Sequence, residues 1–162
     1  ANRMSPAGIS MFYCAFDYAI AKAETFDESD KKRKYLSRAN FSPRRDLTVI
    51  DLTKLKGVNI FDERSIANYD WLIFLQGFIR DLQAPIVRDG KEHIEYVPTQ
   101  VVTEYFRFAY SERKKMKIDG IIYPSSKDWK KAACVLFFDQ CESIIEVPMS
   151  KGSIQTQKIL AP

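Results

Sequence analysis

The stretch Ile118-Asp119-Gly120-Ile121-Ile122-Tyr123 opens the last third of the chain, where the hydrophobic pattern changes to short β-type runs. Three more such runs follow, separated by polar residues, at Ala133–Phe138, Ser143–Val147 and Ile154–Leu160. Short runs of β-branched and aromatic residues between polar segments are typical of strands. We therefore expect a sheet of several strands in this part of the chain.

Two further strands are predicted upstream. Met11-Phe12-Tyr13-Cys14-Ala15-Phe16 is short, aromatic-rich and preceded by a turn cluster, and Leu47-Thr48-Val49-Ile50-Asp51-Leu52 is a β-branched run. A short helix is predicted over Tyr18–Phe26, with Asp17 as its N-cap, because good helix formers follow one another there without a breaker.

The middle of the chain has helical spacing. Between about residues 64 and 82, apolar side chains at intervals of three and four predict a core helix. After the charged turn region Pro85–Glu92, a second amphipathic helix is predicted, with Pro98 in its first turn. Helices interspersed with strands favour the α+β class, a mixed sheet with flanking helices, over a doubly wound parallel fold. The apolar positions of the helix predicted between about residues 64 and 82 are Ile66, Tyr69, Leu72, Ile73, Phe74, Leu75, Phe78, Ile79 and Leu82.

Basic residues gather in three clusters, Lys31–Lys34, Pro43-Arg44-Arg45 and Arg113–Lys117. The first two lie in the charged segment Asp27–Arg45, which we expect to be a mobile loop. The clusters raise an alternative function of another class, a basic nucleic-acid- or protein-binding module. Nucleic acid is not the favoured partner, because the net charge is only +4 and few aromatic residues lie within the clusters.

Length and composition limit the class of protein. At 162 residues the default is one domain, and because a motif begins at once after Ala1-Asn2, we expect residues 1–162 to be a single catalytic domain cut from a longer chain. The three cysteines are odd in number and lack C-x-x-C spacing, which fits a reducing compartment. No apolar run approaches the roughly 18 residues of a membrane span. We expect a cytoplasmic protein without membrane contact.

Most familiar catalytic signatures are missing, including G-x-G-x-x-G, the Walker loop, H-E-x-x-H and G-x-S-x-G. His93 is the only histidine, and it lies in a charged stretch. Histidine-based triads and histidine-rich metal sites are therefore excluded, and no metal is expected.

Three separated segments carry polar residues that are hard to explain as ordinary solvent-exposed side chains. They are Arg3-Met4-Ser5-Pro6-Ala7-Gly8 with Tyr13, Ala21-Lys22-Ala23-Glu24, and Asp119–Ser126. In this order they resemble the RES family, which is named for an arginine, a glutamate and a serine. Tyr96–Glu104 also resembles the segment before the second strand group in RES domains that follow a HEPN-like region. The resemblance runs from Arg3 to about Phe138.

The resemblance implies a fold similar to that of ADP-ribosyltransferases and an enzyme that breaks the nicotinamide–ribose bond of NAD. Water or inorganic phosphate would be the acceptor, and the protein would act as a toxin or defence effector. Transfer of ADP-ribose to a protein target is the alternative within the enzyme class, since the same bond breaks. NAD is then the substrate, and the implied partners are an antitoxin or regulatory protein and an upstream domain of the same chain.

The resemblance also implies four catalytic residues. Glu24 would stabilise the positive charge that develops on the ribose, and Arg3 could hold the pyrophosphate with its planar fork. Tyr13 could stack on the nicotinamide ring. Ser125 is expected to bind rather than attack, because no histidine is available to activate its hydroxyl.

A second set of candidates for lining the NAD pocket consists of Thr99, Gln100, Tyr123 and Ser126. Thr99 and Gln100 could equally cap and begin the helix that follows Pro98. Because Ser126 is adjacent to Ser125, either serine could be the functional one.

Overall fold

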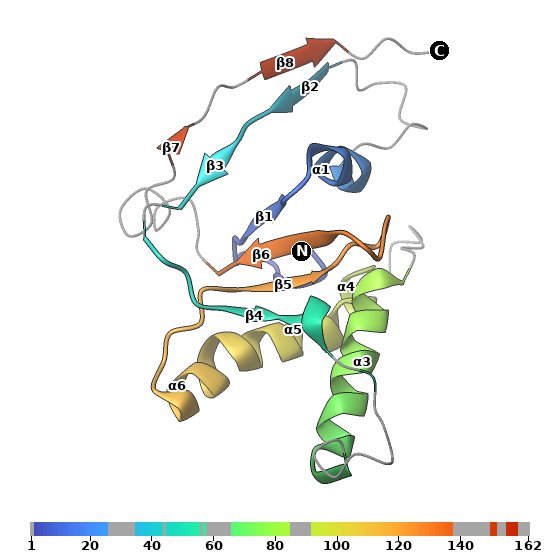
Figure 1. The fold of residues 1–162 in the computed structure, drawn as a ribbon, viewed down its shortest axis with the longest axis vertical. Helices are drawn as coiled ribbons and strands as arrows, with labels where there is room; N and C mark the ends of the chain where they lie inside the picture. Colours follow the sequence, from blue (N-terminus) through green and yellow to red (C-terminus); the bar gives the residue numbers. More distant parts are fainter. Residues whose placement is uncertain are drawn as a thin grey trace.

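The computed structural model describes residues 2–25, 35–43, 45–55, 57, 66–84, 92–137, 150–151 and 155–158. These residues form a mixed sheet with flanking helices, which confirms the predicted α+β class (Figure 1). The predicted strand over residues 143–147, the basic cluster at 31–34 and the turn region 85–91 lie outside the described residues. Within the described part of the chain, no helix has the length and hydrophobicity needed to cross a membrane.

The central sheet has the strand order β1-β6-β5-β4. The strands β1 (Phe12–Ala15) and β5 (Gly120–Pro124) both run antiparallel to β6 (Ala132–Leu136), whereas β4 (Val49–Asp51) runs parallel to β5. The strands predicted around residues 11–16, 47–52, 118–123 and 133–138 are therefore confirmed, with ends shifted by one to two residues. After β4 the chain turns into a short 3-10 helix, Leu52–Lys54.

Two antiparallel ribbons lie on one side of this sheet (Figure 1). In the first, β2 (Tyr35–Arg38) pairs with β8 (Gln155–Lys158); in the second, β3 (Phe41–Ser42) pairs with β7 (Ser150–Lys151). The expectation of a mobile loop over residues 27–45 is therefore wrong for 35–38 and 41–42. Their backbone groups are satisfied by strands far away in sequence, which a local excess of charge does not reveal.

Helix α1 (Tyr18–Thr25) follows β1 directly. The Asp17 carboxylate accepts a hydrogen bond from the Ala19 amide at 2.6 Å, as expected of an N-cap. Figure 1 places α1 on the same side of the sheet as the ribbons, between β2 and the strands β1 and β6. The helix is thus held between two layers and can present different side chains to each.

Helix α3 (Tyr69–Gln83) packs against the opposite side of the sheet through Leu75, Phe78 and Leu82. Its first half differs from the prediction of a helix that is core throughout, since Tyr69, Trp71, Ile73 and Phe74 are exposed. Figure 1 shows the reason: the N-terminal half of α3 extends beyond the edge of the sheet. Periodicity identified the apolar face, but only half of that face meets the sheet.

The second predicted helix is built of consecutive pieces. Pro98 lies in the first turn of α5, as predicted, and the helix continues through a π-helical turn into α6. It ends at Lys115, which has a left-handed backbone with φ of 51°. The pieces are α4 (Glu92–Glu95), α5 (Val97–Glu104), the π-helical turn (Tyr105–Tyr110) and α6 (Ser111–Lys114).

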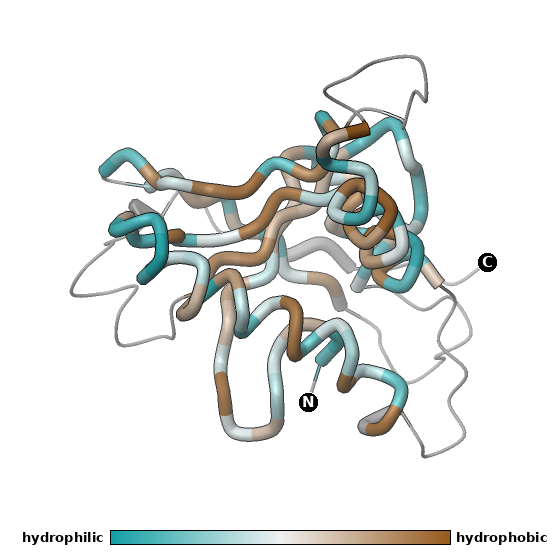
Figure 2. Tube along the Cα trace, turned by 90° about the horizontal axis from the view of Figure 1, so that it is seen from below, coloured by the Kyte–Doolittle hydropathy of each residue, from teal (hydrophilic) through white to brown (hydrophobic). Residues whose placement is uncertain are grey.

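The core lies mainly between the sheet and helices α3 and α5. Ile121 of β5 and Val135 of β6 are fully buried there, together with Phe106 and Phe78. A smaller cluster on the other face joins Cys134 and Leu136 to half-buried side chains of β1, β4 and β5. Figure 2 shows the hydrophobic segments running along neighbouring strands of the sheet. Burial on both faces explains why the strands read as apolar runs rather than as alternating patterns.

An ion pair fixes the entry to β5. The Arg45 guanidinium donates two hydrogen bonds to the Asp119 carboxylate, at 2.9 and 2.7 Å, and the Thr48 amide donates a third at 2.9 Å. Asp119 is buried, whereas Arg45 keeps part of its surface in solvent. Burial by itself raises the pKa of Asp119, but the hydrogen bonds from Arg45 and Thr48 and the nearby positive charges lower that pKa below its ordinary value overall.

Gly120 is the position in the sheet where a side chain does not fit. A Cβ atom there would lie 2.3 Å from the carbonyl oxygen of Val135 and 2.8 Å from a Leu136 methyl carbon. We expect Gly120→Ala to lower the free energy of unfolding by about 2 kcal/mol and the melting temperature by about 6 °C, because β5 and β6 must separate. Gly77→Ala in α3 is the control, since its Cβ would meet only Arg80 at 3.9 Å. Equal melting temperatures for both variants would contradict this reading.

Candidate active site

Three of the residues predicted from the sequence meet at one point. The Glu24 carboxylate, near the end of α1, accepts hydrogen bonds from the Ser125 hydroxyl at 2.6 Å and from the Ser126 amide at 3.2 Å. The Ser126 hydroxyl lies 3.2 Å from both carboxylate oxygens. Glu24 itself is exposed. The arrangement therefore presents a negatively charged group to solvent in a fixed orientation.

Ser125 is held in place from several directions. It is 1% exposed, its hydroxyl accepts from the Lys127 amide at 3.1 Å, and its own amide donates to the Lys131 carbonyl at 2.8 Å. Lys131 in turn pairs with Asp17, at the start of α1, at 3.0 Å. The loop between β5 and β6 is thus tied to α1 at both ends of the helix. These contacts fix Ser125 in the position from which its hydroxyl orients the Glu24 carboxylate.

Tyr13 links β1 to the turn that carries Arg3. Its hydroxyl donates to the Ser5 hydroxyl at 3.2 Å and accepts from the Met4 amide at 3.3 Å. Burial raises the pKa of Tyr13 above its ordinary value, so the phenol stays protonated at neutral pH. The residue is nevertheless 37% exposed, so part of its surface is open to solvent.

Tyr123 lies on β5, two residues before Ser125, and is half-buried. Burial raises its pKa, and the neighbouring negative charge of Glu24 and the proximity of Tyr13 raise it further. The phenol of Tyr123 therefore stays protonated at neutral pH.

The guanidinium of Arg3 is directed elsewhere. It donates to the carbonyls of Asp81, Leu82 and Ala84, at the C-terminal end of α3. A cation there satisfies carbonyls that have no partner within the helix and opposes the negative end of the helix dipole. The backbone of Arg3 is close to the site through Met4 and the Tyr13 hydroxyl, but the side chain is engaged with α3 in this structure.

Thr99 and Gln100 are buried at the start of α5 and face the same turn. The Thr99 hydroxyl donates to the Arg3 carbonyl, and the Gln100 side-chain amide donates to the carbonyls of Asn2 and Ser5 at 2.8 and 3.3 Å. Their polar groups are thus used to fasten the N-terminal turn to α5. A direct contact of either residue with NAD stays a prediction.

The structure therefore places the predicted residues in two groups. Glu24, Ser125 and Ser126 form the first, with Tyr123 two residues before Ser125 on β5. Tyr13 belongs to the second through its contact with the turn held by Thr99 and Gln100. Sequence reasoning missed the roles of Ser5 and Met4 in this connection. The position of Ser5 inside the quoted arginine motif was the available signal, but nothing in the sequence indicates that its hydroxyl meets Tyr13.

The described part of the chain also bears on metal-binding groups and on the basic clusters. There, no group of three or more histidine, cysteine, aspartate or glutamate side chains is placed to hold a metal ion. In one of the basic clusters that raised the nucleic-acid-binding alternative, Arg45 forms an ion pair with Asp119 within the protein. Arg113 and Lys114 of the last cluster end the short exposed helix α6.

Comparison with known proteins gives one match. A family model described as the RES domain matches residues 1–157. Neither the curated proteins nor the solved structures contain a match to the chain. The expected similarity to the ADP-ribosyltransferase fold therefore stays a prediction, beyond the α+β class itself.

Proposed function

The chain belongs to the RES domain family, and from that premise we propose that it breaks the nicotinamide–ribose bond of NAD, with water or phosphate as acceptor. Membership of this family supports an NAD-related, enzymatic and toxin-like function. The finer assignment is supported by one observation: the Glu24 carboxylate is exposed and is oriented by hydrogen bonds from Ser125 and Ser126.

The proposed chemistry needs an anion beside the ribose. When the bond breaks, its electron pair leaves with nicotinamide, which becomes neutral, and the ribose acquires oxocarbenium character. A fixed carboxylate stabilises this charge more in the transition state than in the ground state. Water then adds to the ribose and releases a proton, giving ADP-ribose, or phosphate adds and gives ADP-ribose 1″-phosphate. No covalent serine step is required.

The other residues take supporting roles in this proposal. Tyr13 stacks its exposed ring surface on the nicotinamide and keeps its hydroxyl for the Met4–Ser5 turn. Ser125 and Ser126 orient Glu24. Arg3 holds the N-terminal turn against α3 and acts on the substrate by positioning that turn. Its guanidinium would contact the pyrophosphate only after giving up its hydrogen bonds to the carbonyls of α3.

The test is to incubate the purified chain with NAD in phosphate-free buffer and in phosphate buffer, and to follow products by mass spectrometry. We expect free nicotinamide in at least one buffer, with ADP-ribose or its 1″-phosphate as the second product. A parallel incubation of labelled NAD with cell lysate distinguishes transfer to protein, since label would stay on macromolecules. A folded protein that releases no nicotinamide under any of these conditions would refute the proposal for residues 1–162 as one catalytic domain.

The two serines should differ in effect. Ser125→Ala removes the 2.6 Å hydrogen bond that orients Glu24, and we expect kcat to fall about 100-fold with KM little changed, because the carboxylate is misplaced by a fraction of an ångström or more. Ser126→Ala should have a smaller effect, because the Ser126 amide still donates to Glu24. Steady-state kinetics of both variants, with exposed Ser10→Ala as control, measure this. A larger loss in Ser126→Ala would reverse the assignment.

A further inference from the structure

Two cysteines face each other across the central sheet. Cys14 of β1 is the partner of Cys134 of β6 in the antiparallel register, and both are free thiols in this structure. Residues directly opposite in an antiparallel pair point to the same face of the sheet, with Cα atoms about 4.5 or 5.5 Å apart. Disulfides span Cα distances of about 4.4–6.8 Å. The register therefore brings the two cysteines within reach of a disulfide, whichever kind of antiparallel pair they form.

The two side chains already interact with each other through a hydrogen bond between their sulfur atoms. This hydrogen bond lowers the pKa of Cys14 below its ordinary value, although burial opposes the shift. The same hydrogen bond, burial and the charge of Cys14 raise the pKa of Cys134. Cys14 is therefore the member of the pair that forms a thiolate more readily, with Cys134 as the hydrogen-bond donor.

The two cysteines also differ in exposure. Cys14 is half-buried on β1, the edge strand of the central sheet, whereas Cys134 is 5% exposed on β6, an inner strand. Both belong to the smaller cluster on that face of the sheet. A partly exposed thiol of lowered pKa reacts with oxidants, and a buried thiol beside it is protected until the first has reacted.

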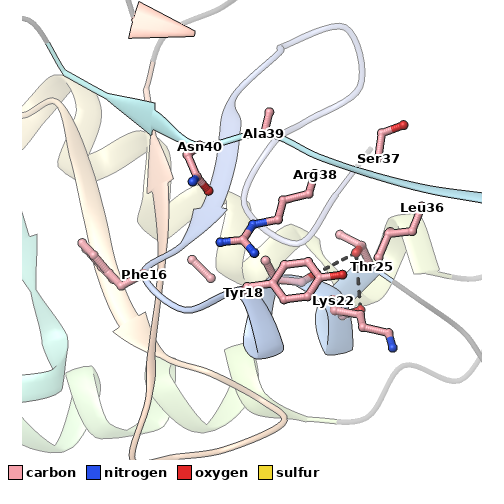
Figure 3. Close-up of a pocket in the computed structure, with 11 residues that line it drawn as sticks. Phe16, Tyr18, Lys22, Thr25, Leu36, Ser37, Arg38, Ala39 and Asn40 are labelled. Carbon is pink, nitrogen blue, oxygen red and sulfur yellow. Dashed lines mark hydrogen bonds between the residues drawn. The ribbon is translucent and has the colours of Figure 1, made fainter. Parts of the chain in front are cut away.

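A cavity of about 240 Å³ lies beside the end of β1, between α1 and residues 36–40 (Figure 3). Ala15 and Phe16, which follow Cys14 directly in the chain, form part of its wall. A cavity of this size has room for several water molecules. Hydrogen peroxide is only slightly larger than water, so it can approach the end of β1 next to Cys14.

We propose that Cys14 and Cys134 are a redox-sensitive pair, which hydrogen peroxide converts into a disulfide between β1 and β6. The Cys14 thiolate attacks one peroxide oxygen and the O–O bond breaks, which gives a sulfenic acid on Cys14 and a hydroxide that takes up a proton to become water. The Cys134 sulfur then attacks the Cys14 sulfur; the S–O bond breaks, and the hydroxide leaves as water with the proton of Cys134. The two thiols lose two electrons in all, and one peroxide is reduced to two waters.

The disulfide should be reversible. Opposite Cβ atoms in a sheet lie about 4.5–5.5 Å apart, whereas a disulfide brings them to about 3.8 Å, so the two strands must move together. An edge strand such as β1 can move with less disturbance of the sheet. A bond formed against this resistance is more easily reduced than an unstrained one. Such a pair suits a redox sensor in a reducing compartment, and it does not rest on NAD cleavage.

The test uses the Cys141→Ala protein, in which Cys14 and Cys134 are the only cysteines, and a melting transition shows that it is folded. After exposure to hydrogen peroxide, the mass of the monomer should fall by two hydrogens. Nonreducing peptide mapping should link the tryptic peptide Met4–Lys22 to the one that begins at Ala132, and dithiothreitol should restore the original mass. Oxygen addition without a link, a disulfide between two chains, or no reaction would overturn the proposal.

Single variants in the same Cys141→Ala protein separate the two roles. In Cys134→Ala the sulfenic acid on Cys14 has no partner, so dimedone, which traps sulfenic acids, should label Cys14. In Cys14→Ala we expect about tenfold less label on Cys134, because this thiol is buried. Equal labelling would contradict the assignment of Cys14 as the attacking thiol. The link between Cys14 and Cys134 tests the pair itself even if one of these variants does not fold.

Discussion

Glu24→Gln is expected to lower NAD cleavage by about 1,000-fold, equivalent to about 4 kcal/mol of transition-state stabilisation. Glutamine keeps the size of the side chain and an oxygen that can accept from Ser125 and Ser126, but it lacks the negative charge that opposes the oxocarbenium ion. The loss should therefore appear in kcat, while NAD still binds. Nicotinamide release at saturating NAD measures it directly.

The control for this variant is Glu112→Gln, which removes the same charge from the exposed surface of α6. Its activity should equal that of the wild type. Thermal melting should show that both variants are folded, because Glu24 is exposed and is predicted to be catalytic rather than structural. A Glu24→Gln protein that retains most of its activity would remove the carboxylate from the mechanism.

Asp119→Asn is expected to cause the largest loss of stability, about 3 kcal/mol in the free energy of unfolding. The substitution leaves the Arg45 guanidinium facing an amide group and breaks a bidentate pair whose acidic partner is buried. The partial exposure of Arg45 keeps the loss at the lower end of what a buried pair would give. Chemical denaturation of wild type and variant gives the difference.

The same ion pair predicts how stability depends on pH. The folded-state pKa of Asp119 is lowered, so its contribution is fully present above the unfolded-state pKa of about 3.9 and is lost as pH falls through the folded-state pKa. The wild-type chain should therefore lose stability from about pH 4 downward, and Asp119→Asn should lose less over the same range. Parallel pH profiles for the two proteins would contradict the assignment.

Local patterns predicted the central sheet because each of its strands is a short apolar run with both faces buried. The runs at residues 118–123 and 133–138 became the central pair β5 and β6. The ribbon strands β2 and β3 were missed because their partners are more than 100 residues away and neither strand is a continuous apolar run. Helix α3 shows a second limit of sequence patterns. The spacing of apolar residues identifies which face of a helix is apolar, but only the tertiary structure shows how much of that face is buried.

The candidate site was predictable to a similar degree. The family resemblance named Glu24 and Ser125, and the structure places their side chains 2.6 Å apart across 101 positions of sequence. The resemblance did not reveal that the Arg3 guanidinium caps the C-terminal end of α3, because that contact depends on where α3 ends.

The most direct measurement is a crystal structure of the Glu24→Gln protein with NAD bound. We expect the nicotinamide ribose to lie against residue 24, with the nicotinamide ring on Tyr13 and the serines of the β5–β6 loop still hydrogen-bonded to the substituted side chain. NAD bound with its nicotinamide ribose away from residue 24 would contradict a role for the Glu24 carboxylate in breaking the nicotinamide–ribose bond.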